Sequence, residues 1–154
     1  MDLGDILTPG GIYPSLKAAS KKEALKQLSE RAAGVTGIPE RQIFDMLLQR
    51  ERLSSTGLGR GIAIPHIKLT SIKNIVCLFA RLDNAIDFES HDGEPVDLVF
   101  LLLAPEHASG DHLKALARIS RIVRETSALE SLRSATTAAE IKAVLLAPAT
   151  SHAA

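Results

Sequence analysis

Aromatic residues are scarce in this chain, which has 154 residues, 3% of them aromatic, and no tryptophan. Because 45% of the residues are nevertheless hydrophobic, the core must consist of leucine, isoleucine, valine and alanine. A chain of this length buries roughly 68–70% of its unfolded surface, which is enough for a full core. We therefore expect one domain over residues 1–147, followed by a disordered tail at residues 148–154.

An excess of charge is also missing, since 18 Lys and Arg residues balance 18 Asp and Glu residues. The isoelectric point is near 7.0, so net charge gives no attraction to nucleic acid or to an anionic membrane surface. We expect no nucleic-acid partner, and any electrostatic recognition must be local.

The chain has a single cysteine, Cys77, so it forms no internal disulfide, as is typical of a reducing compartment. Its first residues, Met-Asp-Leu-Gly-Asp, lack the basic and then apolar regions of an export signal. No apolar run approaches the ~18–20 residues that a membrane helix needs. We expect a cytoplasmic protein with no membrane insertion and with Cys77 as a buried structural thiol.

Capping and breaking signals divide the chain into helices and strands. Residues 9–14 contain two prolines and two glycines, which predict turns with at most a short strand at 12–13. Ser20 and Glu23 form a capping box, which predicts a helix that ends at Gly34. A second helix is expected from Pro39. Apolar runs predict strands at 62–64, 75–80 and 96–103, and capped periodic segments predict helices at 110–124, 127–133 and after Thr137.

The connection between residues 66 and 75 is too short for a helical crossover, so the sheet should not be wholly parallel. These elements together predict an α/β fold in which a small mixed β-sheet carries helices on both faces.

The central stretch of the chain is Gly-Ile-Ala-Ile-Pro-His-Ile-Lys-Leu at residues 61–69. Pro65 should end the strand at 62–64 and leave His66 on a loop at its mouth. The preceding segment, residues 54–61, is expected to be a pliable loop that allows an anion to approach the backbone. Its candidate phosphate-site residues are Ser55, Thr56, Gly57, Gly59 and Gly61. Taken alone, a histidine after a turn is more often a solvated surface residue.

Two further residues are candidates for the same site. His112 falls in the first turn of a predicted helix, where unpaired N–H groups and the helix dipole attract anions. Arg50 continues the apolar stripe of the second helix, so its guanidinium either reaches water along the core edge or points to an anion site. A nucleophilic imidazole with such donors beside it suits phosphoryl transfer, in which positioning and electrostatics carry most of the catalysis.

Other chemistries fit the sequence less well. The glycines precede a strand rather than a helix and lack the G-K-[ST] ending of a nucleotide loop. No H-E-x-x-H or paired-cysteine spacing indicates a metal, and no G-x-S-x-G context indicates a hydrolase. We expect no metal and no cofactor.

The segment Ser-Thr-Gly-Leu-Gly-Arg-Gly-Ile-Ala-Ile-Pro-His, residues 55–66, resembles the active-site signature of the IIA components of the bacterial phosphotransferase system, mannitol/fructose type. It is most similar to the free-standing nitrogen-regulatory IIA proteins, and the likeness continues through residues 85–88, 92–100 and 112–120. The resemblance implies a mannitol-type IIA fold in which His66 accepts a phosphoryl group on Nε2 from an HPr-like phosphocarrier protein. It also implies that His112 donates to the phosphate and that Arg50 is the arginine beside the site.

The sequence departs from the family after the active histidine, where a small residue, commonly glycine, is usual and Ile67 stands here. A β-branched side chain restricts the backbone and either crowds the phosphate or adds apolar contact to a partner. Ile67 and Lys68 are therefore candidate partner contacts.

The resemblance implies a nitrogen-regulatory phosphoryl carrier that acts through its phosphorylation state on regulatory targets such as a potassium transporter or a sensor kinase. Two alternatives remain open. One is a stand-alone sugar-system IIA that passes phosphate to a IIB domain, and the other is a regulatory binding module that is not phosphorylated.

Overall fold

The computed structural model describes residues 3–107 and 109–147, which build one six-stranded mixed sheet. The strands are β1 (Leu7–Leu16), β2 (Gly57–Gly59), β3 (Ile62–Ala63), β4 (His66–Leu69), β5 (Val76–Ile86) and β6 (Val96–Pro105). Their order is β1-β5-β6-β3-β2, and β4 pairs with β6 beyond β3. The β5–β6 and β2–β3 pairs are antiparallel, whereas β1–β5, β3–β6 and β4–β6 are parallel. The expected mixed sheet is confirmed.

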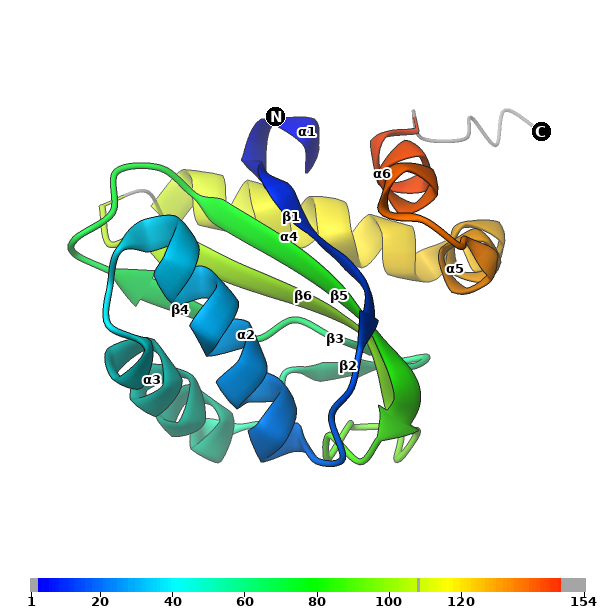
Figure 1. The fold of residues 1–154 in the computed structure, drawn as a ribbon, viewed down its shortest axis with the longest axis horizontal. Coiled ribbons are helices and arrows are strands. Elements are labelled where there is room, and N and C mark those ends of the chain that lie inside the picture. Colours follow the sequence, from blue (N-terminus) through cyan, green and yellow to red (C-terminus); the bar gives the residue numbers. More distant parts are fainter. Residues whose placement is uncertain (1–2, 108, 148–154) are drawn as a thin grey trace.

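Helices cover both faces of the sheet, as the sequence predicts. They are α1 (Leu3–Ile6), α2 (Lys21–Thr36), α3 (Glu40–Leu53), α4 (Ser109–Arg124), α5 (Thr126–Ser134) and α6 (Ala138–Leu146). Alternate residues of β6 point to opposite faces: Leu101 packs with α2 and α3, and Phe100 packs with α1, α4, α5 and α6. Figure 1 shows α2 and α3 on one side of the sheet and the long α4 on the other.

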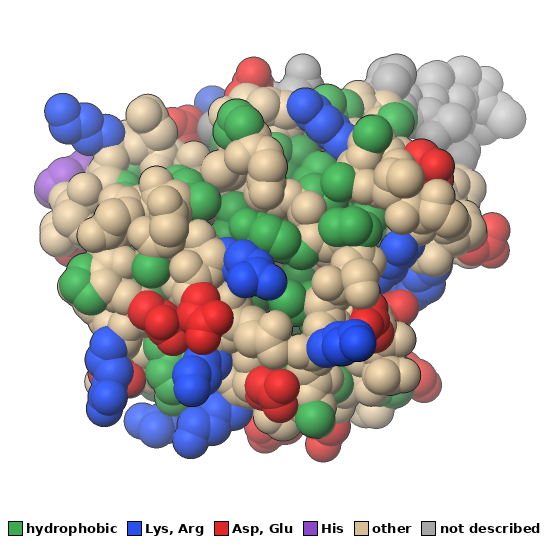
Figure 2. All heavy atoms as spheres, viewed as in Figure 1, with side chains coloured by type: hydrophobic (Ala, Val, Ile, Leu, Met, Phe, Trp, Pro, Cys, Tyr) green, Lys and Arg blue, Asp and Glu red, His purple; other side chains and the backbone are tan. Residues whose placement is uncertain are grey.

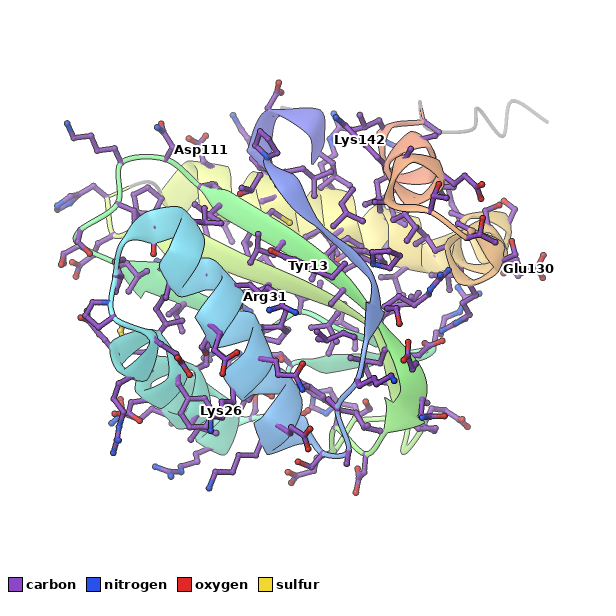
Figure 3. All side chains as sticks on the ribbon, viewed as in Figure 1. Tyr13, Lys26, Arg31, Asp111, Glu130 and Lys142 are labelled. Atoms are coloured by element: carbon purple, nitrogen blue, oxygen red, sulfur yellow. The ribbon has the colours of Figure 1, made fainter. Side chains whose placement is uncertain are left out.

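The N-terminal segment was expected to be mostly turns, and this prediction is wrong. Residues 7–16 form β1, which lies parallel to β5 with register shifts between Leu7 and Ile12 and between Tyr13 and Leu16. β1 is an edge strand, and an edge strand tolerates proline because only one of its two sides pairs with another strand. Arg31 of α2 contacts this edge strand through a cation–π interaction, in which its Cζ lies 5.1 Å from the ring centroid of Tyr13 (Figure 3).

Local capping predictions are confirmed at two helix starts. The hydroxyl of Ser20 accepts from the N–H of Glu23, 3.1 Å away, and that of Thr137 accepts from the N–H of Glu140 at the same distance. The predicted end of α2 at Gly34 is wrong, because the helix continues to Thr36 and Gly37 supplies the left-handed cap at φ 77°.

The strand predicted at residues 75–80 is longer than expected, because β5 continues to Ile86 after a register shift that follows Arg81. Cys77 on this strand is fully buried, and burial raises the pKa of its thiol to about 12, as expected for a structural cysteine.

The surface carries both signs of charge close together. On the face drawn in Figure 2, Lys and Arg side chains stand next to Asp and Glu side chains. Within residues 3–107 and 109–147, no helix is both long enough and apolar enough to cross a membrane. The expected disordered tail at residues 148–154 lies outside the described residues.

Candidate functional site

His66 is the first residue of a strand, so the expected loop after Pro65 is wrong. Pro65 has no N–H to donate, but its carbonyl accepts a hydrogen bond from the N–H of Leu102, 2.9 Å away. Pairing with β6 therefore continues past the proline, and β4 begins with His66 opposite Leu102. Among the described strands β4 pairs with β6 alone and is thus an edge strand.

The site lies where the two helical layers meet around this edge strand. Ile67 and Leu69 of β4 pack into the core on the side of α2 and α3, so His66 and Lys68 face the other side. His112, in the first turn of α4, places its ring 5.3 Å from that of His66 between centroids, with 51° between the planes. Figure 1 shows β4 and the beginning of α4 at the same end of the molecule. In Figure 3, Asp111, which precedes His112 in the sequence, marks the end of the molecule that holds the site, and Glu130 on α5 lies at the opposite end.

A backbone carbonyl determines which ring nitrogen of His66 carries the proton. Nδ1 of His66 lies 2.7 Å from the carbonyl oxygen of Ile64. Because a carbonyl oxygen only accepts, Nδ1 must carry the proton, which leaves the lone pair on Nε2. His66 is half-buried and lines a hollow at the surface, from which a docking protein can approach the ring. The hydrogen bond therefore holds the ring in one orientation, with Nε2 as the nitrogen that can act as the nucleophile.

His112 is a buried partner to that nucleophile. The residue is 8% exposed, and its Nε2 is buried with no hydrogen-bond partner among the described residues. Burial lowers the pKa of His112 below its usual 6.5, and its electrostatic interactions with His66 and Lys68 lower it further. His112 is therefore neutral at pH 7 and has a ring nitrogen available for a ligand.

The depressed pKa of His112 predicts a pH dependence of stability. Below the unfolded pKa of about 6.5 the unfolded chain binds a proton that the folded His112 resists, so the free energy of unfolding falls as pH falls. Chemical denaturation between about pH 7.5 and pH 5.5 should show the wild type losing stability faster than His112→Gln, with a difference of at most about 1.4 kcal/mol per pH unit. Equal pH slopes in the two proteins would contradict the assignment.

Arg50 reaches the same end of the sheet from the other helical layer. It lies in the last turn of α3, is half-buried, and its Nη1 donates to the carbonyl of Ser54 at 3.0 Å. A hollow of about 520 Å³ brings Arg50 together with His66 and Lys68. Its remaining lining residues are Met46, Gln49, Arg52, Leu53 and Ile67.

The two candidate partner contacts differ in their surroundings. Ile67 is 6% exposed and packs in the core with α2 and α3, so its side chain is directed away from the His66 ring. Lys68 is exposed on the histidine side of β4. The structure therefore does not indicate that Ile67 crowds a phosphate. Of the two residues, Lys68 offers more surface to a partner.

The beginning of the expected pliable loop is fixed in place near the site. The Ser55 hydroxyl donates to the carbonyl of Phe88 at 2.7 Å and accepts from the N–H of Gly57 at 3.1 Å. Thr56 is buried, and its carbonyl accepts from the N–H of Ile64, two residues before His66. Gly57 starts β2, where an added Cβ would lie 2.3 Å from Oγ of Ser90.

Gly59 and Gly61 lie farther from the histidines than expected. The carbonyl of Gly61 accepts from the N–H of Asp97, which precedes Leu102 on β6 by five residues, or roughly 16 Å. Both glycines have positive φ angles, 105° and 84°, because the chain reverses here from β2 into β3. An added Cβ would meet the carboxylate of Asp92 at Gly59, and the ion pair of Arg133 with Asp97 at Gly61. The structure does not bring these two glycines to the histidines.

The sequence analysis did not identify two exposed apolar residues at the site. Leu53 at the end of α3 is 84% exposed, and Leu113, which follows His112, is 66% exposed. An apolar side chain off the buried stripe of a helix is the pattern that marks them. Exposed apolar residues at a functional site are typical of a docking surface. Within the described residues, no group of three His, Cys, Asp or Glu side chains is placed to hold a metal ion.

The chain matches, over residues 5–147, the model of a family described as "Phosphoenolpyruvate-dependent sugar phosphotransferase system, EIIA 2". A nitrogen regulatory protein of Bradyrhizobium diazoefficiens is 55% identical to the chain over 148 residues, which cover 96% of the chain and 97% of the relative. The likeness thus extends over almost the whole length of both proteins.

Solved structures share the fold. The nitrogen regulatory protein IIA-Ntr from Neisseria meningitidis superposes with a TM-score of 0.89 at 34% identity, covering 93% of this chain and 98% of that one. IIA mannitol of Escherichia coli, solved in complex with phosphorylated IIB mannitol, superposes with a TM-score of 0.76 at 23% identity, covering 91% and 98%. The mannitol-type IIA fold that the sequence implies is confirmed.

Proposed function

Since the chain belongs to the EIIA 2 family of the phosphoenolpyruvate-dependent sugar phosphotransferase system, we propose that it is a nitrogen-regulatory carrier phosphorylated on Nε2 of His66. Members of this family are phosphoryl-transfer carriers. A 55% identical relative that is a nitrogen regulatory protein supports the regulatory role. The observation that carries the site assignment is the hydrogen bond from Nδ1 of His66 to Ile64, which leaves Nε2 as the nucleophile.

The transfer step follows from this geometry. The lone pair on Nε2 of His66 attacks the phosphorus of a phosphohistidine on an HPr-like donor. The N–P bond of the donor breaks and its electron pair returns to the donor imidazole, so the phosphoryl group moves without an added co-reactant. The His66 ring gains positive charge in this step, and the carbonyl of Ile64, accepting from Nδ1–H, stabilises it.

Neighbouring donors stabilise the negative charge on the phosphoryl oxygens. Neutral His112, with its buried and unpartnered Nε2, can donate a ring N–H to one oxygen. Arg50, in the same hollow as His66, adds a fixed positive charge and several N–H donors. Preorganised donors of this kind are worth most where charge develops in the transition state.

Phosphorylation would act as an electrostatic switch on a docking surface. The phosphoryl group brings about −1.5 to −2 charge to a site bordered by the exposed side chains of Leu53 and Leu113. A partner that fits the neutral surface loses affinity when that charge appears, and one with a basic site gains it. We propose that such partners are cytoplasmic regulatory targets, with a potassium transporter or a sensor kinase as the kinds to test.

The alternative sugar-system role rests on the shared fold, because the E. coli mannitol IIA docks a phosphorylated IIB protein. The binding-module alternative rested on crowding by Ile67, and this side chain lies in the core. Both alternatives are separated from the regulatory role by one experiment.

That experiment is incubation with a phosphorylated HPr-like protein, followed by mass spectrometry of the intact chain. We expect a mass gain of one phosphate and little onward transfer when a sugar-system IIB domain is then added. Rapid transfer to the IIB domain would identify a sugar-system IIA. No mass gain with any HPr-like donor would leave only the binding module.

A further inference from the structure

A buried carboxylate belongs to the residue that follows the site arginine in the sequence. Glu51 lies in the last turn of α3 and is 8% exposed. Its Oε1 lies 2.9 Å from Nζ of Lys21 and accepts a hydrogen bond from the N–H of Thr56 at 3.1 Å. Its Oε2 is buried with no hydrogen-bond partner among the residues that the structure describes. An ion pair recovers only part of the free energy lost on burying charge, so an apolar residue would serve stability as well.

The backbone that Glu51 holds also holds the reactive groups. Segment 54–56 contains Ser54, whose carbonyl accepts from Nη1 of Arg50 at 3.0 Å. It also contains Thr56, whose carbonyl accepts from the N–H of Ile64 at 3.0 Å. The carbonyl of Ile64 in turn accepts from Nδ1 of His66. Glu51 is therefore linked to Arg50 through segment 54–56, and to His66 through the same segment and then Ile64.

We propose that Glu51 is a positioning residue for phosphoryl transfer: its carboxylate fixes segment 54–56, and this segment aims the Arg50 guanidinium at His66. The proposal rests on the proposed function for its kinetic consequence. Glu51 is too buried to touch a phosphoryl group or a docked partner, so it acts through segment 54–56. This segment contacts Arg50 directly, through Ser54, but reaches His66 only through Ile64, so the main effect is on Arg50. Misplacing such a group by about 1 Å is enough to cost on the order of 10²-fold in rate.

The chain offers a matched control in Glu89. Its Oε1 lies 3.7 Å from the same Lys21 ammonium, but its side chain is 76% exposed. It forms no hydrogen bond to segment 54–56 within the described part of the chain. Glu89→Gln therefore removes a carboxylate near Lys21 without disturbing the segment.

A double-mutant cycle with Arg50 tests the proposal. Glu51→Met fills the same space without an acceptor, and it should lower the rate of phosphoryl uptake about 10- to 100-fold with an unchanged KM for the donor. Glu51→Gln keeps an oxygen that can accept from Thr56 N–H and should recover most of the rate. Glu89→Gln should match the wild type. In an Arg50→Ala background, Glu51→Met should change the rate less than about twofold, because its effect passes through Arg50.

A second measurement on the unphosphorylated protein separates this proposal from the proposed function. The NMR order parameter of the Arg50 Nε–H bond should fall in Glu51→Met and stay unchanged in Glu89→Gln. Should Glu51→Met fail to fold, the double variant Lys21→Met with Glu51→Met removes both charges and permits the same measurement.

The outcomes are distinct. Equal rate losses from Glu51→Met in the wild-type and Arg50→Ala backgrounds, or an unchanged Arg50 order parameter, would overturn the positioning role. Absence of phosphoryl uptake by the wild type would overturn the proposed function instead, and the Arg50 order parameter would still decide the role of Glu51.

Discussion

His66→Ala is expected to take up no phosphate from a phosphorylated HPr-like donor, whereas the wild type gains one. The substitution removes a half-buried ring whose Nδ1 donates to a backbone carbonyl, which leaves the lone pair on Nε2. His112 is no substitute, because it is 8% exposed. The uptake rate should fall by at least about 10³-fold, as for loss of a covalent nucleophile. Quenched-flow mixing followed by intact-mass analysis measures it.

The matched control for this variant is His91→Ala, which removes an exposed histidine from a turn. It should be phosphorylated at the wild-type rate. Both variants should unfold at temperatures close to that of the wild type, since neither side chain is fully buried. Phosphorylation of His66→Ala at the rate of the control would place the acceptor elsewhere.

Arg50→Ala is expected to lower the rate of phosphoryl uptake by about 10²–10³-fold, as for loss of one preorganised charged donor. Arg50 lines the same hollow as His66, and Ser54 holds its guanidinium by a hydrogen bond of 3.0 Å. Arg50→Lys should be intermediate, because an ammonium keeps the charge but lacks the planar fork. Single-turnover kinetics at saturating donor measure the effect.

Arg41→Ala provides the comparison on the same helix. Arg41 is exposed at the beginning of α3, where it pairs with Asp45 at 3.7 Å, so its loss should leave the rate unchanged. If Arg50→Ala behaved like Arg41→Ala, Arg50 would be a residue of the core edge that caps the end of α3.

The parts of the fold that the sequence predicted are those decided by near neighbours. The capping boxes at Ser20 and Thr137 involve residues three positions apart, so the pattern alone places both helix starts. The mixed sheet followed from the short connection after His66. Continuous apolar runs located β5 and β6, because both faces of these strands are buried.

The parts that failed depend on distant neighbours. Pro9 and Pro14 indicate turns locally, yet residues 7–16 form β1 because they pair with β5 as an edge strand, where proline is tolerated. Pro65 was expected to end the strand, but Leu102 on β6 donates to its carbonyl and pairing resumes at His66. Neither partner is visible in a short window of sequence.

The candidate site likewise has residues that the sequence identified and features that depend on distant parts of the chain. His66, His112 and Arg50 were identified from the sequence, and the structure places all three at one end of the sheet. The separation of Gly61 from His66 depends on the register of β3 against β6, which the sequence does not show. Burial of Glu51 depends on its contact with Lys21, 30 residues earlier in the chain.

The most direct test of the account is to identify the phosphorylated ring nitrogen by ¹H–¹⁵N NMR of the ¹⁵N-histidine-labelled protein after uptake. The hydrogen bond from Nδ1 of His66 to Ile64 predicts a single adduct, on Nε2 of His66, with Nδ1 still protonated. A phosphoryl group on Nδ1, or on another histidine, would contradict it.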